Sequence, residues 1–155
     1  MATTVGEHYK RPESVLVVVY TETGKVLLLR RTDHEDFWQS VTGSMRWGET
    51  DPMQTAIREL KEETGLDAGN ALINLNLSHQ YEIFPQWRHR YALGITENTE
   101  HAFALKLEDV VDVSINADEH TEAVWLKFSD VADKMGSWTN RKVVDHLNPG
   151  STNQQ

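Results

Sequence analysis

The sequence predicts an α/β fold in which a mixed β-sheet lies between helices, and three observations support this. Two largely apolar runs, Ser14–Tyr20, which is rich in valine, and Val26–Leu29, have apolar residues at successive positions, which is typical of strands covered on both faces. The segment Pro52–Thr64 carries the signals of a short amphipathic helix. Further candidate strands and helices follow it. Because 155 residues with 39% hydrophobic content suffice for one buried core, we expect a single domain over residues 1–155.

The elements of the first half can be justified in order. The two apolar runs form a predicted β-hairpin, because the five residues between them, Thr21–Lys25, are short enough for a tight loop. Trp38–Thr42 is a third candidate strand, and it ends directly before a glycine. In the helix that follows, Asp51 suits the N-cap, Pro52 the first turn and Gly65 the position just past the end. Its core-facing stripe should be Met53, Ala56, Ile57, Leu60 and Thr64.

The second half predicts four extended segments, Leu72–Leu77, Gln80–Phe84, His101–Leu107 and Ala123–Phe128. Within the third of these, Phe103 and Leu105 should share one face. Ser129 and Asp130 resemble a cap for a helical stretch, and Thr139 or Asn140 should begin a last helix. We expect an ordered core over about 9–147, with disorder in the first several residues and in 148–155.

Composition excludes several classes of function. A chain without cysteine has no disulfides, thiolate metal sites or cysteine nucleophiles. The start of the chain lacks a signal-peptide apolar region, and the longest apolar run, Val15–Tyr20, is too short to span a bilayer, so we expect a cytoplasmic protein without a membrane partner. The net charge of −9 opposes binding to a nucleic acid polymer. It is compatible with a small polyphosphate, provided that a metal ion and a few cations make the pocket locally basic.

Three glutamates late in the helix, Glu59, Glu62 and Glu63, are the strongest chemical signal. Their spacing places all three on one face, where like charges cost roughly 0.2–0.5 kcal/mol per pair and oppose the helix dipole. Such a local conflict points to function. Oxygen ligands on a rigid helix suit Mg²⁺, which keeps waters that a phosphate substrate can displace. The alternative is a solvated acidic face.

The surrounding residues are more specific. Gly43, five residues, Glu49, a connector and the run Arg58–Leu66 resemble the Nudix box of pyrophosphohydrolases. The connector from Thr50 to Ile57 has one residue more than the family pattern. Because Pro52 keeps its usual step to Arg58, the extra residue should lie at Thr50 or Asp51. This leaves open where Glu49 lies relative to the helix ligands.

The resemblance extends beyond the box, over roughly Tyr9–Leu147, to the bacterial dihydroneopterin triphosphate diphosphatases. These are Nudix enzymes of folate synthesis that remove pyrophosphate from 7,8-dihydroneopterin 3′-triphosphate and leave the monophosphate. The matching segments are Tyr9–Pro12, Phe37–Ser44, Arg88–Tyr91, Asn98–Glu100, Glu119–His120 and Ser137–Arg141. The resemblance implies the Nudix fold, an α/β/α sandwich, whereas the pattern alone supports only a mixture of helices and strands.

The resemblance also implies roles for individual residues. Glu59, Glu63 and Glu119 would bind Mg²⁺, with Mn²⁺ as a substitute, and Glu62 would be a further ligand or a base. Arg58 would orient the glutamates, and Gly43 and Gly65 would support the box. Substrate contacts would fall on Lys10, Arg30, Thr42, Tyr81, Glu82, Ile83, Phe84 and the region of Ser137.

Each of these assignments has a simpler alternative. A single Lys or Arg is more often a solvated surface group, and Tyr81 or Phe84 could be core residues instead of a wall for a pterin ring. Arg88 and Arg90 could border the phosphate site or form structural ion pairs. His120 could orient Glu119 or be merely exposed.

Two rival functions remain open at this stage. One is a Nudix hydrolase of purine or oxidised purine (d)NTPs, because pterin and guanine share a similar hydrogen-bonding edge. The other is a Nudix-fold module that binds a nucleotide-like ligand without hydrolysis, although such modules usually lose box glutamates that this chain retains. The expected partner is a small-molecule triphosphate, and the expected assembly is a monomer or a homodimer.

Overall fold

The computed structural model describes residues 8–34 and 36–148. The expectation of disorder in the first several residues and in 148–155 falls, except for Asn148, outside these residues. The strands are β1 (Glu13–Thr21), β2 (Lys25–Arg31), β3 (Trp38–Gln39), β4 (Val41–Ser44), β5 (Ile73–Glu82), β6 (Glu97–Leu107) and β7 (His120–Lys127). The helices are α1 (Pro52–Thr64), α2 (Phe128–Val131) and α3 (Trp138–Leu147), with 3₁₀ turns η2 (Gly69–Ala71) and η3 (Pro85–Arg90).

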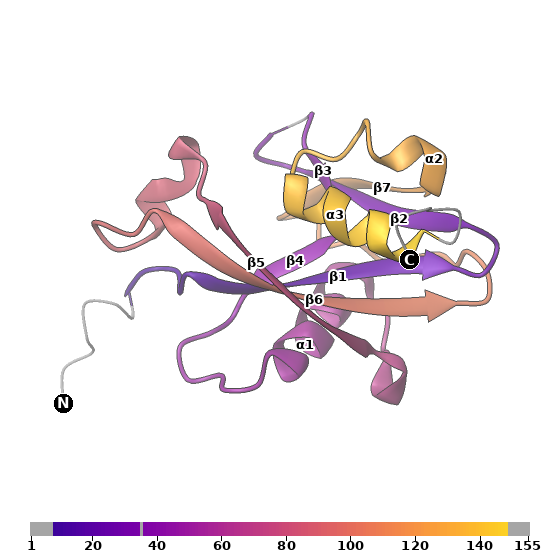
Figure 1. The fold of residues 1–155 in the computed structure, drawn as a ribbon, viewed down its shortest axis with the longest axis horizontal. Helices are drawn as coiled ribbons and strands as arrows, with labels where there is room; N and C mark the ends of the chain where they lie inside the picture. Colours follow the sequence, from indigo (N-terminus) through magenta and orange to yellow (C-terminus); the bar gives the residue numbers. More distant parts are fainter. Residues whose placement is uncertain (1–7, 35, 149–155) are drawn as a thin grey trace.

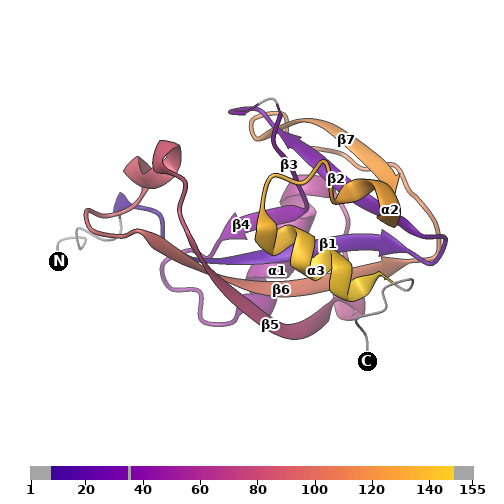
Figure 2. The ribbon, with the colours of Figure 1, turned by 45° about the horizontal axis from the view of Figure 1, so that its top comes forward.

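The strands form one mixed sheet with helices on both faces, so the predicted sandwich is confirmed (Figure 1). β1 lies at its centre, parallel to β6 and antiparallel to β2 and β4. Its side chains alternate between two cores. Val15 and Val17 pack with Leu60 of α1, whereas Leu16 packs with Val143 of α3. Figure 2 shows α3 in front of β1 and α1 behind it. Full burial of each such side chain contributes roughly 1.5–3 kcal/mol.

The sheet opens where the hairpin strands diverge. β1 and β2 pair with each other at Tyr20 and Val26, close to the turn. Beyond this point β3 pairs with β2, and β4 pairs with β1. The segment formed by β3 and β4 therefore lies between the two diverging strands of the hairpin. The sequence predicted one strand over Trp38–Thr42. That prediction is wrong at Ser40, whose backbone N–H donates to the Asn140 side chain (3.0 Å) and interrupts the strand.

Other boundaries also differ from the prediction, since β6 begins at Glu97 and not at His101, and β7 begins at His120 and not at Ala123. The two extended segments expected between Leu72 and Phe84 are one strand, β5, with an irregularity between Asn74 and Leu77 where Asn76 has a φ of 55°. α2 begins at Phe128, so Ser129 lies inside it and does not cap it. α3 begins at Trp138.

The Glu-rich helix has the predicted bounds and caps. The Asp51 side chain accepts a hydrogen bond from the Met53 N–H (3.0 Å), and Gly65 adopts the left-handed conformation that ends the helix. Ala56 and Leu60 are buried, and Met53 and Ile57 pack against the same core. None of the helices within the described ranges combines the length and apolar character needed to cross a bilayer.

Candidate active site

Gly43, at the end of β4, lets the Glu-rich helix approach the sheet. A Cβ at this position would overlap the carboxylate of Glu59. The backbone of Gly43 needs no left-handed conformation, so the close approach alone explains why a glycine fits here. This contact places Glu59 of α1 directly beneath the strand that also carries Thr42.

A second carboxylate of α1 lies in a small acidic cluster. Glu63, Glu119 and His120 bring ligand atoms within 4.8 Å of one another. Glu63 and His120 are 1% and 2% exposed, whereas Glu119 remains open to solvent. Neither Glu63 oxygen has a hydrogen-bond partner within the described part of the chain, and His120 Nδ1 lies 3.5 Å from Glu63 Oε2. A buried carboxylate without partners costs free energy unless a proton or a cation compensates it.

The electrostatics of this cluster fit a divalent cation. Burial raises the pKa of Glu59, which lies outside this cluster, to about 7; the charge of Arg58 opposes this shift, and Glu62 and Glu119 add to it. Burial and the neighbouring Glu119 also raise the pKa of Glu63. Burial lowers the pKa of His120, so a neutral imidazole does not supply the missing positive charge. The donor set, carboxylate oxygens and an imidazole nitrogen, suits a divalent metal ion.

The alternative of a solvated acidic face is therefore wrong for two of the three glutamates. Glu59 and Glu63 are buried, and Glu62 alone is exposed, because the helix turns the first two toward the sheet. The exposed-histidine alternative for His120 is also wrong. Of the predicted metal ligands, Glu63 and Glu119 belong to the 4.8 Å cluster, whereas Glu59 and Glu62 lie outside it.

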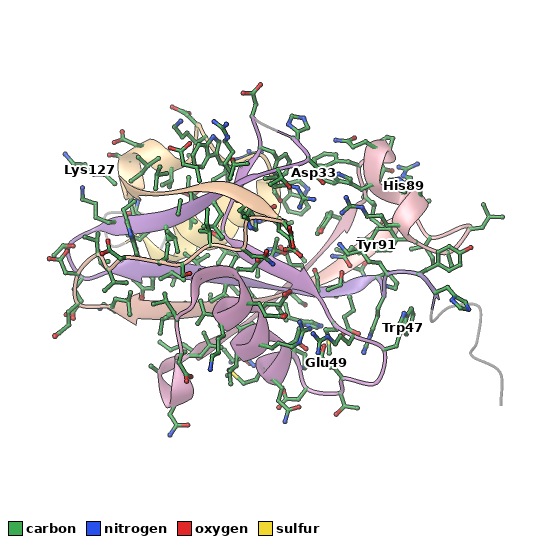
Figure 3. All side chains as sticks on the ribbon, turned by 180° about the vertical axis from the view of Figure 1, so that it is seen from behind. Asp33, Trp47, Glu49, His89, Tyr91 and Lys127 are labelled. Atoms are coloured by element: carbon green, nitrogen blue, oxygen red, sulfur yellow. The ribbon has the colours of Figure 1, made fainter. Side chains whose placement is uncertain are left out.

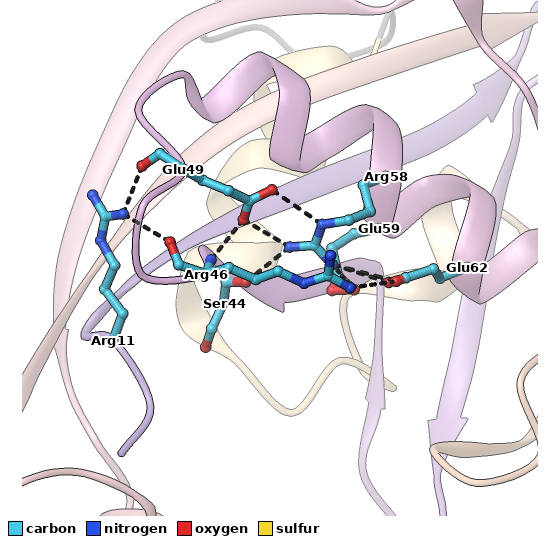
Figure 4. A network of polar contacts seen from close by, with 7 residues as sticks. All are labelled: Arg11, Ser44, Arg46, Glu49, Arg58, Glu59 and Glu62. Carbon is cyan, nitrogen blue, oxygen red and sulfur yellow. Dashed lines mark hydrogen bonds and ion pairs between the residues drawn. The ribbon is translucent and has the colours of Figure 1, made fainter. Parts of the chain in front are cut away.

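Arg58 joins the carboxylates around the box (Figure 4). Its guanidinium donates to both oxygens of Glu49, from Nε (3.1 Å) and Nη2 (2.9 Å), and Nη1 donates to Glu62 (2.9 Å). The same Nη1 lies 3.5 Å from Glu59, and Nη2 donates to the Ser44 carbonyl (3.3 Å). This two-pronged contact lowers the pKa of Glu49 to about 2 and raises that of Arg58.

The longer connector still delivers Glu49 to Arg58. Glu49 donates its N–H to the Arg46 carbonyl (3.0 Å), and the Arg46 N–H donates back to Glu49 Oε1 (2.6 Å). Gly48 has a φ of 101°, which closes this turn at a position that favours glycine. Arg11 donates to the carbonyls of Arg46 (3.0 Å) and Glu49 (2.7 Å) from outside. Asp51 is the N-cap of α1, so Thr50 is the single residue between Glu49 and the cap.

A cavity opens on the other side of Gly43. It holds about 870 Å³ of empty space, a figure that includes its open mouth. An aromatic group forms one wall, since the ring of Phe37 meets those of Phe84 and Trp87 at 5.9 Å and 5.4 Å between centroids. Figure 3 shows Tyr91, another lining residue, on the same half of the molecule as Asp33 and Glu49, with Lys127 at the opposite end.

The cavity gathers cations in an acidic protein, although Glu82 and Glu100 line it as well. Lys10, Arg31 and Arg90 all line it. Burial of the Lys10 ammonium, followed by repulsion from Arg90 and Arg31, lowers its pKa. Asp33 partly offsets this charge, because it binds Arg31 (2.7 Å) and Arg90 (3.1 Å) and has a pKa lowered to about 2. A phosphate group at this rim would find cations already held in place.

The structure brings most of the expected substrate-contacting residues together. Those that line the cavity are Lys10, Thr42, Tyr81, Glu82, Ile83, Phe84 and Ser137. Arg30 does not: its side chain reaches Thr121 (3.2 Å) and Glu122 (3.7 Å) on β7, and the neighbouring Arg31 takes the place in the cavity. Of the two loop arginines, Arg90 lines the cavity, and Arg88 instead binds the Ile83 carbonyl (2.9 Å) and Glu82 (3.5 Å).

Sequence reasoning assigned no role to several lining residues. The clearest are Asn98 and Glu100 of β6, which are 1% and 3% exposed. No sequence pattern singled them out, because all five residues from Glu97 to His101 are polar and the expected strand began only at His101. Arg31 had no signal either, since the sequence does not tell which of two adjacent arginines faces inward.

The chain matches the NUDIX domain over residues 10–147. It is 45% identical to the dihydroneopterin triphosphate diphosphatase of Escherichia coli strain K12 over 143 residues, which are 90% of this chain and 93% of that protein. It is 42% identical to the protein of the same name from Haemophilus influenzae, covering 88% of this chain and 87% of that one. The solved structure of the E. coli dihydroneopterin triphosphate pyrophosphohydrolase superposes with a TM-score of 0.84 at 44% identity, covering 90% of this chain and 97% of that one.

Proposed function

The chain belongs to the Nudix family, and we propose that it hydrolyses 7,8-dihydroneopterin 3′-triphosphate to dihydroneopterin monophosphate and pyrophosphate. One observation carries this proposal. Gly43 separates a buried carboxylate group on α1 from a cavity with basic and aromatic walls. A substrate with a flat ring and a triphosphate chain can therefore place its ring in the cavity and its phosphates beside the carboxylates. The names of the relatives at 42% and 45% identity supply the particular ring.

The chain's own groups divide the work. Lys10, Arg31 and Arg90 would hold phosphate oxygens at the rim, where an arginine fork can bind two oxygens at once. Glu63, Glu119 and Glu59 would hold Mg²⁺, or Mn²⁺ in its place. When bound, the metal would neutralise phosphate charge and favour ionisation of the attacking water. A carboxylate of this group would accept the proton of that water.

Arg58 would act as a positioning residue. It contacts Glu49, Glu59 and Glu62 at once, so it fixes the carboxylates relative to one another without reaching the cavity itself. Nothing in this arrangement requires a covalent intermediate, because water is the nucleophile. The phosphoanhydride bond breaks, and pyrophosphate leaves.

The test is steady-state hydrolysis of dihydroneopterin triphosphate beside dGTP, 8-oxo-dGTP and ATP, with Mg²⁺ and then with excess EDTA. Products must be identified, so that pyrophosphate is distinguished from inorganic phosphate. We expect the pterin substrate to have the highest kcat/KM, with release of pyrophosphate that EDTA abolishes. A preference for purine triphosphates would keep the hydrolytic chemistry but overturn the assigned substrate. The absence of turnover with all four would overturn the enzymatic proposal itself.

A further inference from the structure

Two buried acceptors lie side by side on the cavity wall. Asn98 and Glu100 are two residues apart on β6, so their side chains point to the same face of the strand. Both line the cavity, and both are more than nine-tenths buried. Within residues 8–34 and 36–148, Asn98 Oδ1 and Glu100 Oε1 have no hydrogen-bond partner. Two buried acceptors that lack partners beside one cavity each need a donor, which a bound ligand with two hydrogen-bond donors can supply.

The neighbouring contacts fix which atom of the asparagine faces the ligand. Asn98 Nδ2 donates to Ser14 Oγ (2.7 Å) and to the Tyr81 hydroxyl (3.0 Å), which uses both amide hydrogens. The amide oxygen therefore remains as an acceptor. Tyr81 itself lines the cavity, and its hydroxyl holds Asn98 in this orientation.

Glu100 is an acid without a compensating cation. It forms no ion pair with any lysine or arginine of the described residues, although three cations lie on the rim of the same cavity. Burial raises its pKa to about 7, and the hydroxyl of Thr139 opposes that shift. Hydrogen-bond donors on a bound ring would lower the cost of the ionised form.

We propose that Glu100, assisted by Asn98, determines specificity by accepting hydrogen bonds from the ring N–H and the exocyclic amino group of a 2-amino-4-oxopyrimidine ring. Pterin and guanine rings both present these two donors on one edge, and a carboxylate has two oxygens to receive them. On the corresponding edge, adenine has an amino donor beside a ring nitrogen that is an acceptor. The lone pair of that ring nitrogen would repel the carboxylate. The inference rests on the proposed function for the orientation of the substrate, with its ring in the cavity.

The test removes one donor from the ligand and one acceptor from the protein. GTP and ITP differ only in the 2-amino group. The affinity for each is measured from its competitive inhibition of dihydroneopterin triphosphate hydrolysis. If that substrate is not turned over, the two affinities are measured by calorimetry. Glu100→Gln is compared with Glu97→Gln, an exposed position on the same strand. Neopterin, which lacks phosphates, is titrated separately without metal.

For the wild type and for Glu97→Gln we expect GTP to bind at least tenfold more tightly than ITP. In Glu100→Gln this ratio should approach one, neopterin binding should weaken at least tenfold, and the affinity for ITP should change little. Glu100→Asp, which retains the carboxylate, should recover part of the ratio. Equal losses for GTP and ITP in a folded Glu100→Gln protein would overturn the inference and leave a structural role.

The two proposals can fail separately. Hydrolysis of the pterin substrate with an unchanged GTP to ITP ratio in Glu100→Gln would refute the role of Glu100 and leave the proposed function standing. Loss of the ratio in Glu100→Gln, together with a wild-type protein that does not turn over the pterin substrate, would do the reverse. Thermal unfolding of each variant shows whether it is folded.

Discussion

Replacement of Arg58 by methionine tests whether one guanidinium holds the Nudix box together. The side chain of Arg58 is 20% exposed and that of Glu49 is 19% exposed, so this pair is partly shielded from water. Arg58→Met leaves Glu49 with its backbone contact but without both guanidinium hydrogen bonds. Hydrogen bonds to a charged group contribute about 1.5–3 kcal/mol each, and the loss of one partner from a fully buried ion pair costs about 3–5 kcal/mol. We therefore expect a loss of about 2–3 kcal/mol in the free energy of unfolding.

The pKa of Glu49 gives a second estimate of the same interaction. Its fall from 4.5 to about 2 corresponds to roughly 3 kcal/mol, which solvent screening reduces because the pair is not fully buried. A carboxylate whose pKa is lowered by folding stabilises the fold above its unfolded pKa, and this contribution is lost as the pH falls through the folded pKa. The difference in the free energy of unfolding between the wild type and Arg58→Met should thus have its full value at pH 7 and should be smaller by about 1 kcal/mol at pH 3.5.

The assay is urea unfolding followed by tryptophan fluorescence at both pH values. Arg46→Met is the matched control, because Arg46 is 65% exposed and lies 3.7 Å from Glu62, where an ion pair contributes about 0–1 kcal/mol. A loss in Arg58→Met no larger than in Arg46→Met would refute the reasoning. So would a difference that does not change between pH 7 and pH 3.5, since it would then come from packing and not from the ionised Glu49.

Three further predictions concern the site itself. Glu63→Gln should lower kcat by orders of magnitude. The metal-free variant should nevertheless be at least as stable as the metal-free wild type, because the substitution removes a buried acid without partners. The rise in Tm on addition of Mg²⁺, measured by differential scanning fluorimetry, should be smaller in the variant than in the wild type. Gly43→Ala should cost about 1–3 kcal/mol and reduce kcat, because the added Cβ displaces Glu59, and unchanged stability and rate would contradict the close approach. Arg31→Met should raise KM about 10–100-fold in steady-state kinetics, whereas Arg30→Met should raise it much less. A larger KM for Arg30→Met than for Arg31→Met would show that the wrong arginine was assigned to the cavity.

Local signals explain why the Glu-rich helix could be predicted to the residue. Its N-cap, first-turn proline and terminal glycine act within a few positions of the sequence, and the structure contains all three. The interruption at Ser40 is of another kind. Its backbone N–H bonds to Asn140, one hundred residues later, so no pattern near Ser40 could have indicated that the strand splits there.

The exchange of Arg30 for Arg31 has a similar origin. Side chains alternate along a strand, so one of two adjacent arginines should face the cavity, but the choice depends on register. β2 changes register against β7 between these two residues. A bulge of this kind depends on the partner strand and is not encoded in the two arginines themselves.

Glu49 illustrates how a local irregularity can leave the site geometry intact. The sequence placed one extra residue between Glu49 and the helix, which should have moved its carboxylate by about one residue length. Two anchors absorb that residue. Asp51 fixes the start of the helix from one side, and the Arg58 fork with the Arg46 N–H fixes the Glu49 carboxylate from the other. Because both anchors lie at the ends of the connector, Thr50 can be accommodated between them without changing the register of Glu59 and Glu63.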